Sequence, residues 1–281
     1  MARTIFEVKD LQKVYKVPGG KDVHALNNVS LTVGENEFIC VVGPSGCGKT
    51  TLLNIVAGLE PYDSGSVTIH GQPVIGPGPD RAVVFQQYAL YPWMTVRKNI
   101  EFALKFQTHE VPTGKTDPQT GAPIMKQVHF TKAEKAEMIQ KYIKMVSLEG
   151  FEEAYPSGLS GGMKQRVAIA RSYATRSDVL LMDEPFGALD AQTRAQLQED
   201  LLNTWAQERK TCLFITHDVE EAVLLASRVV IMSARPGRIK TMIDIDLPYP
   251  RNQATKMDAK FIAFKNQIWD QVYKEYLEVK K

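Results

Sequence analysis

The chain has 281 residues, 44% of them hydrophobic, which suits one large α/β unit with a smaller appended part. Its 34 lysines and arginines nearly balance its 32 aspartates and glutamates, and a formal net charge of +2 gives no support to nucleic-acid binding. No stretch approaches the roughly 18 uninterrupted apolar residues of a membrane span, and the first ten residues lack the apolar region of a signal peptide. We therefore expect a cytosolic protein unless a partner holds it at a membrane.

The first third of the chain has strand patterns. Between residues 6 and 33, β-branched runs and the turn sequences PGG (18–20) and GEN (34–36) predict short antiparallel strands. Further along, apolar runs alternate with helical patterns, which predicts a mainly parallel sheet covered by helices, an α/β fold. These runs are residues 38–42, 67–70, 82–85, 179–183, 212–216 and 229–232.

Residues 94–177 have a helical pattern instead. Residues 132–146 carry an apolar stripe at helical spacing, and Ser160 is expected to cap a second helix that follows it. Within this region, residues 108–129 are rich in Pro, Thr, Gly and Gln and predict an exposed loop. His109 and His129 flank this excursion, and without clustered carboxylates we expect them to be surface residues rather than metal ligands.

The C-terminal segment, residues 255–281, predicts an amphipathic helix. Its apolar residues at spacings of three and four are Phe261, Phe264, Ile268, Val272 and Tyr276. We expect this helix to dock on the body of the protein, and membrane attachment is the alternative.

Three cysteines, an odd number without metal-type spacing, indicate reduced thiols. Cys40 and Cys212 lie in apolar strand patterns. Cys47 lies near a helix start, a setting that tends to lower a thiol pKa, but we expect it to be simply a small residue that fits the turn; a reactive thiol is the alternative.

The sequence GPSGCGKTT, residues 43–51, follows the strand pattern 38–42 and precedes a helix. Two glycines followed by Lys and Thr in this setting are typical of a loop that binds nucleoside triphosphates. We expect backbone N–H groups to face phosphate oxygens, Lys49 to reach the β and γ phosphates and Thr50 to ligate Mg²⁺. The nucleotide-binding candidates are Gly43, Pro44, Ser45, Gly46, Cys47, Gly48, Lys49, Thr50 and Thr51. A second GKT, at 114–116, has His109 in place of the first glycine and is expected to be loop.

Two further segments complete the chemistry. Residues 179–185, VLLMDEP, form a strand pattern ending in two carboxylates. We expect Asp183 to lie beside Mg²⁺ and Glu184 to act as the catalytic base toward water; a buried strand with a polar turn is the alternative. Residues 159–166, LSGGMKQR, are a second glycine-rich helix start and hence a second anion site, which the same ATP cannot also occupy within one subunit.

The segment 159–166 resembles the signature loop of the ATP-binding cassette family. The resemblance implies a head-to-tail dimer in which Ser160, Gly161 and Gly162 of one subunit close on the γ phosphate held by the phosphate loop of the other. It also implies ATP and Mg²⁺ as cofactors and a P-loop NTPase (RecA-like) fold. That fold would comprise an ATP-binding core of residues 1–95 and 178–250 with the antiparallel β subdomain, an inserted helical subdomain of residues 96–177 with the excursion 108–129, and the C-terminal helix of residues 251–281.

The same resemblance implies roles for four isolated residues. Gln86, or the adjacent Gln87, matches a glutamine that contacts Mg²⁺ and water, takes part in catalysis and senses the membrane partner. Asp190 matches the loop that crosses the dimer interface, and His217 matches the switch histidine, a catalytic residue that hydrogen-bonds the γ phosphate. Tyr15 matches the aromatic residue that stacks on adenine, although an aromatic residue in a strand is usually core.

Residues 89–96, 182–194 and 233–239 are similar to importer ATPases for nitrate, taurine, aliphatic sulfonates and related small solutes. This implies an ATPase on the inner face of the cell membrane. Its partners would be a second copy or a paralogue, an integral membrane permease and, indirectly, an extracytoplasmic solute-binding protein. A soluble, non-transport ABC ATPase is one alternative, although the chain lacks a second cassette and a coiled-coil insertion. A phosphotransferase, in which 160–166 only caps a helix, is the other.

Overall fold

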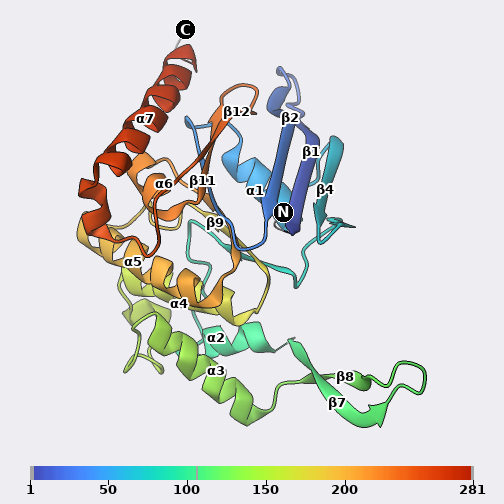
Figure 1. Cartoon of the computed structure of the whole chain (residues 1–281). Coiled ribbons are helices and arrows are strands. Elements are labelled where there is room, and N and C mark those ends of the chain that lie inside the picture. The colour runs from blue at the N-terminus through green and yellow to red at the C-terminus, as the bar shows by residue number, and fades with distance from the viewer. Residues whose placement is uncertain (1–2, 106, 280–281) are drawn as a thin grey trace. The chain divides into compact units, whose positions relative to one another are not determined.

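A computed structural model describes residues 3–105 and 107–279 of the chain (Figure 1). The chain divides into two compact units, each described here by itself. Residues 1–89 and 177–281 form the core unit, and residues 90–176 form the helical unit. No helix within the described ranges is both long and apolar enough to cross a membrane.

The core unit is built on a six-stranded sheet of order β12-β11-β3-β10-β9-β6, in which only the edge pair β11 and β12 is antiparallel. The strands are β3 (Phe38–Val42), β6 (Arg81–Val84), β9 (Val179–Asp183), β10 (Thr211–Ile215), β11 (Arg228–Ser233) and β12 (Arg238–Asp244). Except for 67–70, each run expected to be a strand of this sheet lies in it to within one residue, which confirms the mainly parallel α/β fold.

A four-stranded antiparallel sheet has the order β2-β1-β4-β5. Its strands are β1 (Thr4–Tyr15), β2 (Val23–Gly34), β4 (Ser64–Ile69) and β5 (Gln72–Pro73). The antiparallel N-terminal strands are confirmed, but β1 and β2 have 12 residues each and are not short. The assignment of residues 67–70 to the parallel sheet is wrong, because Val67 lies opposite Val8 in an antiparallel pair. An apolar run indicates burial but does not specify which strand it pairs with.

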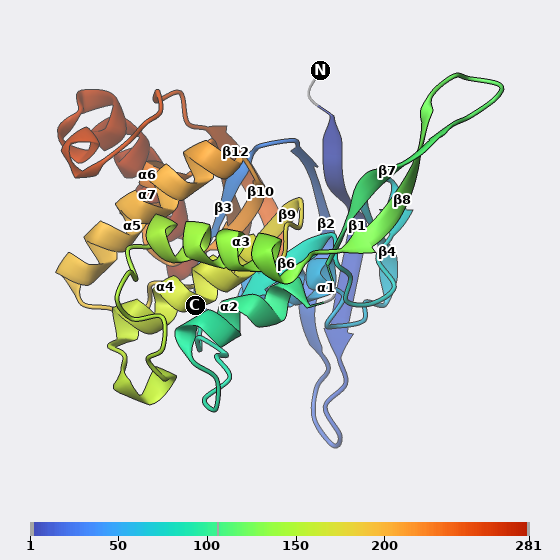
Figure 2. The ribbon, with the colours of Figure 1, turned by 90° about the horizontal axis from the view of Figure 1, so that it is seen from below.

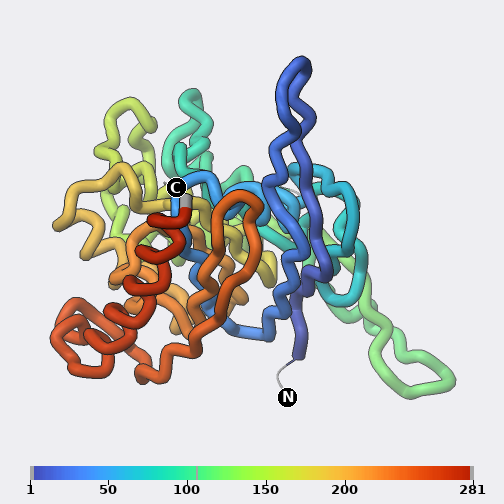
Figure 3. Tube along the Cα trace, turned by 90° about the horizontal axis from the view of Figure 1, so that it is seen from above, coloured from blue at the N-terminus to red at the C-terminus, as the bar shows by residue number. Residues whose placement is uncertain are grey.

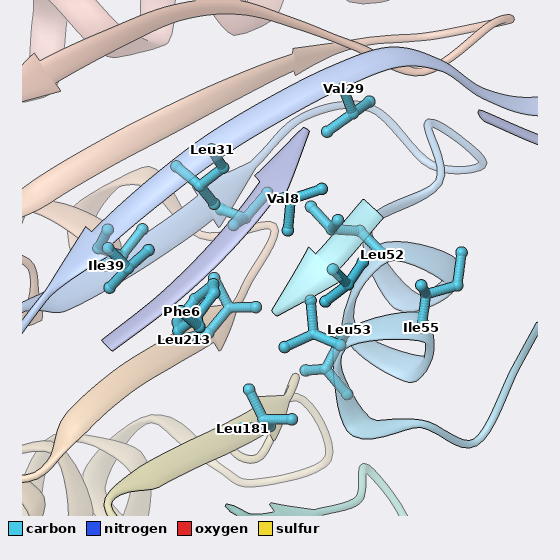
Figure 4. Close-up of a cluster of buried hydrophobic side chains, with 14 of the residues drawn as sticks. Phe6, Val8, Val29, Leu31, Ile39, Leu52, Leu53, Ile55, Leu181 and Leu213 are labelled. Atoms are coloured by element: carbon cyan, nitrogen blue, oxygen red, sulfur yellow. The ribbon is translucent and has the colours of Figure 1, made fainter. Parts of the chain in front are cut away.

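The main hydrophobic core of this unit joins the two sheets through α1 (Lys49–Ala57), as Figure 4 shows. Phe6 comes from the antiparallel sheet, Ile39 and Leu213 come from the parallel sheet, and Leu52 and Leu53 come from α1. Each of these side chains is at most 1% exposed. Because every second residue of a strand points to the same face, the core-facing residues of β3 are Ile39 and Val41.

Further helices belong to the core unit: α5 (Ala191–Glu208), α6 (Val219–Leu225) and α7 (Ala259–Val279), with a 3₁₀ turn at Gln253–Met257 before α7. Trp205 of α5 packs on Phe38 of β3, with ring centroids 5.8 Å apart. Helix α7 contacts α6 and β11, and Glu220 of α6 pairs with Lys265 of α7 at 3.4 Å. The prediction of a C-terminal helix docked on the body is thus confirmed, with residues 280–281 outside the described ranges.

The helical unit packs three helices against one another (Figure 2). They are α2 (Val96–Leu104), α3 (Lys132–Met145) and α4 (Gly161–Ala174), and a 3₁₀ turn spans Pro156–Gly158. Thr131 and Glu134 form a reciprocal capping box that begins α3. Ser160 caps α4 as predicted, since its Oγ accepts from the Met163 N–H at 3.3 Å.

Residues 108–129 form a hairpin of β7 (Thr108–Thr116) and β8 (Pro123–His129), so the prediction of loop for them, and for the second GKT, is wrong. Every side chain of the two strands is exposed or half-buried. Because β7 and β8 pair with each other in a two-stranded sheet and bury no side chain fully, their sequence needs no apolar stripe. Their polar composition therefore resembles that of a loop. His109 is half-buried rather than on the open surface, because its ring stacks on Phe130 with centroids 4.4 Å apart.

Candidate nucleotide-binding site

The phosphate loop, residues 43–48, connects the central strand β3 to α1. Gly46 and Gly48 have φ of 76° and 89°, a left-handed conformation that glycine adopts without cost. A Cβ at Gly48 would lie 2.7 Å from the Ala25 carbonyl oxygen, and one at Gly43 would lie 2.6 Å from that of Met232. Among residues 3–105 and 107–279, no side chain caps the N-terminus of α1, so the first N–H groups of this helix remain available to an anion.

The Lys49 side chain is buried under this loop, at 7% exposure. Its Nζ donates to the carbonyl oxygens of Gly43 at 2.9 Å and Pro44 at 3.2 Å. The loop therefore curves around the ammonium group of Lys49. This places the positive charge next to the loop N–H groups that would bind phosphates.

The Cys47 thiol lies under the same loop and is fully buried. Burial raises its pKa, and this outweighs the lowering effect of Lys49, whose Nζ lies 3.7 Å from Sγ. Burial therefore favours the expected role of a small residue that fits the turn over a thiol of lowered pKa, because desolvation of the thiolate exceeds the local positive potential. Cys47 is a packing residue of the turn.

Asp183 ends β9 beside the start of α1. Its Oδ1 accepts a hydrogen bond from Thr50 Oγ1 at 3.2 Å. Burial raises the pKa of Asp183, and the neighbouring charge of Glu184 raises it further. A hydroxyl and a carboxylate oxygen are ligands that Mg²⁺ prefers, and their chemistry fits an ion whose other ligands are phosphates and waters.

Glu184 and His217 meet beside the phosphate loop. His217 Nδ1 lies 3.0 Å from Glu184 Oε2, and Glu184 has φ of 41°, a strained conformation for a non-glycine residue. The capping role at α6 belongs to Asp218, whose Oδ1 accepts from the N–H groups of Glu220 and Glu221. His217 is 60% exposed and free of that role.

A cleft of about 1190 Å³ lies over the phosphate loop. The predicted site residues that line it are Tyr15, Ser45, Gly46, Cys47, Gly48, Lys49, Thr50, Thr51 and Glu184. Tyr15 is 38% exposed there, which is consistent with a ring available for stacking. Gly43, Pro44 and His217 line an adjoining cavity of about 380 Å³, together with aromatic residues of α7.

Other predicted residues lie elsewhere. Gln86 and Gln87 are exposed and follow the carboxyl end of β6. Asp190 lies outside the cleft and caps α5, accepting from the Thr193 N–H at 3.0 Å, a bond that lowers the pKa of Asp190. In the helical unit, Ser160 caps α4 and is exposed. Gly161 and Gly162, the first two residues of this helix, are half-buried and buried, respectively.

The cleft also has lining residues that the sequence did not single out as site residues. They are Lys21, Asp22, Val23, His24, Ala25, Asn27, Arg235, Pro236 and Arg238. Residues 235–238 follow β11. Because α/β proteins bind ligands at the carboxyl ends of parallel strands, this position after a strand could have identified them as site residues from the sequence.

The profile of the ABC transporter family matches residues 26–187, more than half of the chain. The chain belongs to the ABC transporter family. This ABC ATPase is 49% identical over 272 residues to an uncharacterized ABC transporter ATP-binding protein of Methanocaldococcus jannaschii, covering 97% of this chain and 92% of that protein. It is 44% identical over 268 residues to the nitrate import ATP-binding protein NrtD of Synechocystis, covering 93% of this chain and 92% of the relative.

Among solved structures, this ABC ATPase resembles a dimeric ATP-binding cassette in a post-hydrolysis state bound to ADP and Pi. The TM-score is 0.70 at 30% identity, over 87% of this chain and all of the other. The P-loop NTPase fold with antiparallel N-terminal strands is confirmed. The chain is an ATP-binding, ATP-hydrolysing subunit of a transporter.

Proposed function

We propose that this ABC ATPase powers an importer for a small solute of the nitrate, sulfonate or taurine kind. The observation that carries the proposal is its likeness over 93% of its length to a protein named for nitrate import. The ATPase would act on the inner face of the cell membrane, attached to a separate permease that an extracytoplasmic binding protein supplies. The solute never touches this chain, so its choice belongs to the partners.

Hydrolysis in this proposal uses the residues gathered at the cleft. Lys49 and the loop N–H groups hold the β and γ phosphates, and Tyr15 stacks on adenine. Glu184 accepts a proton from the attacking water, and the His217 ring, whose Nδ1 lies 3.0 Å from that carboxylate, helps to position Glu184 and contacts the γ phosphate. Thr50, Asp183 and Gln86 would hold Mg²⁺, which neutralises developing charge on the phosphates.

The proposed working unit is a head-to-tail dimer. Ser160, Gly161 and Gly162 begin a helix, and such a start offers N–H groups to an anion, here the γ phosphate bound by the other subunit. Asp190 would lie at the interface. We assign residues 1–95 and 178–250 to the ATP-binding core, 96–177 to the signature subdomain and 251–281 to the C-terminal helix. ATP would close the dimer, and loss of the γ phosphate would open it.

Two measurements test the proposal. At concentrations where monomers dominate, the ATPase rate should rise with the square of the subunit concentration, and a phosphotransferase acting as a monomer would give a linear rise. Purification of the chain from its native membrane should recover an integral membrane protein in stoichiometric amount. Recovery of ribosomes or DNA instead would support the soluble, non-transport alternative.

A further inference from the structure

The turn between β11 and β12, residues 234–237, contacts β2 and the phosphate loop. The trace in Figure 3 shows this turn, in orange, beside the blue N-terminal strands. The Gly237 N–H donates to the Ala25 carbonyl at 3.1 Å, and the Asn27 N–H donates to the Gly237 carbonyl at 2.9 Å. A Cβ at Gly237 would collide with the carbonyl oxygens of Cys47 and Ala25. The turn therefore approaches both segments at a distance that only glycine permits.

Two arginines flank this anchor and line the cleft. Arg235 and Arg238 are both exposed. Within residues 3–105 and 107–279, neither guanidinium group has a hydrogen-bond or ion-pair partner. Arg235 also has φ of 48°, in a region that non-glycine residues seldom occupy and that is enriched at ligand-binding sites. Two such cations on a turn held by Gly237, lining the cleft over the phosphate loop, indicate a binding role.

Their place along the cleft indicates which part of the nucleotide they meet. Gly237 contacts Ala25, on the part of β2 that pairs with the end of β1, where Tyr15 lies. It also packs on Cys47, two residues before Lys49. The turn thus lies between the aromatic residue proposed for the base and the lysine proposed for the β and γ phosphates. The ribose and the α phosphate occupy that interval in any extended nucleotide.

We propose that Arg235 and Arg238 bind ATP directly, by donating to its α phosphate and ribose oxygens. A guanidinium group presents paired N–H donors whose geometry matches a phosphate group, and such charged hydrogen bonds are about twice as strong as neutral ones. Because the α phosphate is common to ATP and ADP, this contact holds both nucleotides. The inference rests on ATP binding in this cleft, a part of the proposed function, and is independent of the transported solute.

The test is calorimetric titration of the full-length chain with ATP and, separately, with ADP. Arg235→Ala and Arg238→Ala are each expected to weaken both affinities about tenfold, leaving their ratio unchanged. Arg209→Ala is the matched control. It removes the same charge at a residue with φ of 47° whose side chain stacks on Trp205 outside the cleft, and it should bind like wild type. Arg→Lys variants at 235 and 238, which keep the charge but lose the paired donors, should weaken binding less and serve if an Ala variant unfolds.

Three outcomes would overturn the inference: wild-type affinity in both Arg→Ala variants, an equal loss in Arg209→Ala, or a loss confined to ATP, which would move the contact to the γ phosphate. The proposed importer function fails by different results. Tight ATP binding by wild type without hydrolysis, or without any membrane partner, would contradict that function and leave the arginine contact intact.

Discussion

His217 Nδ1 lies 3.0 Å from Glu184 Oε2, although 33 positions separate the two residues along the chain. The parallel pairing of β9 and β10 explains the contact. Asp183 and Ile215 are opposite one another at the carboxyl ends of these strands, so the residues that follow emerge side by side. The proposed base is therefore positioned by the proposed γ-phosphate sensor, and loss of either side chain should disable the pair as one unit.

Glu184→Gln keeps the shape of the side chain but removes the proton acceptor. We expect ATP hydrolysis to fall by about 10²–10⁴-fold while ATP binding is retained, which would trap a closed dimer. Steady-state phosphate release and size-exclusion chromatography with ATP measure the two effects. Glu149→Gln, at an exposed surface carboxylate, is the control. Normal turnover in Glu184→Gln would contradict the assigned base.

His217→Ala should lower kcat by about 10²-fold with little change in ATP affinity, because the ring positions Glu184 and contacts the γ phosphate. The double variant with Glu184→Gln should be hardly slower than Glu184→Gln alone, since the two residues act together. Single-turnover kinetics measure this. His129→Ala, at an exposed histidine of the hairpin, is the control. Fully additive losses would show that the 3.0 Å contact has no catalytic role.

Gly237→Ala should destabilise the protein by about 1–3 kcal/mol, because the added methyl group must displace the backbone of Cys47 or Ala25. Chemical denaturation of the nucleotide-free protein measures it. Gly76→Ala is the matched control, since Gly76 has no positive φ and, in the part of the chain that the structure describes, an added Cβ there would meet no atom within 4 Å. Equal stability of the two variants would contradict the close packing of the β11–β12 turn on the phosphate loop.

Asp183→Asn should stabilise the nucleotide-free protein at neutral pH while abolishing magnesium-dependent hydrolysis. Burial raises the native pKa of Asp183 above its unfolded value, so the folded state binds the proton more tightly. The associated stability is fully present below the unfolded pKa and is lost as pH rises through the native pKa. Asn removes the cost of the buried charge, and we expect Tm at pH 7 to rise by about 1–2 °C after allowance for solvent screening.

Thermal melts of wild type and Asp183→Asn across pH 4–8 test this. The difference in Tm should shrink as pH falls toward the ordinary range of an aspartate pKa, about 3.9. A lower Tm for the variant at pH 7 would show that the Thr50 hydrogen bond to the carboxylate outweighs its burial.

The β7–β8 hairpin should be dispensable for folding. Residues 110–127 can be replaced by an Asn-Gly turn that closes the observed His109–Val128 pair. Tm should change by no more than about 2 °C, because no side chain of the two strands is fully buried. Phe130→Ala, at a buried ring next to the hairpin, should cost about 3 kcal/mol and marks where the core begins. A large fall in Tm on shortening the hairpin would contradict the prediction that it is dispensable for folding.

Some features of the chain could be predicted from local sequence because the physics that produces them is local. The phosphate loop is one, since glycine conformations and free N–H groups at the start of α1 arise within a single strand–loop–helix segment. The cap that Ser160 provides for α4 and the apolar stripe of α3 are two further features that arise within one local segment. Pairing partners are not local, which is why residues 67–70 were placed in the wrong sheet and 108–129 were taken for loop.

The sequence by itself determined that this protein binds a nucleoside triphosphate and belongs with the ATP-binding cassettes, because a motif is identified from residue types and their spacing along the chain, without knowledge of contacts. Only the tertiary structure decided what surrounds the phosphate loop. Parallel register placed His217 against Glu184, burial raised the pKa of Cys47 against the lowering effect of Lys49, and the turn anchored by Gly237 placed Arg235 and Arg238 at the cleft. Each of these three features depends on residues that are far apart in the chain. The distances between them are set only when the two sheets pack on their common hydrophobic core.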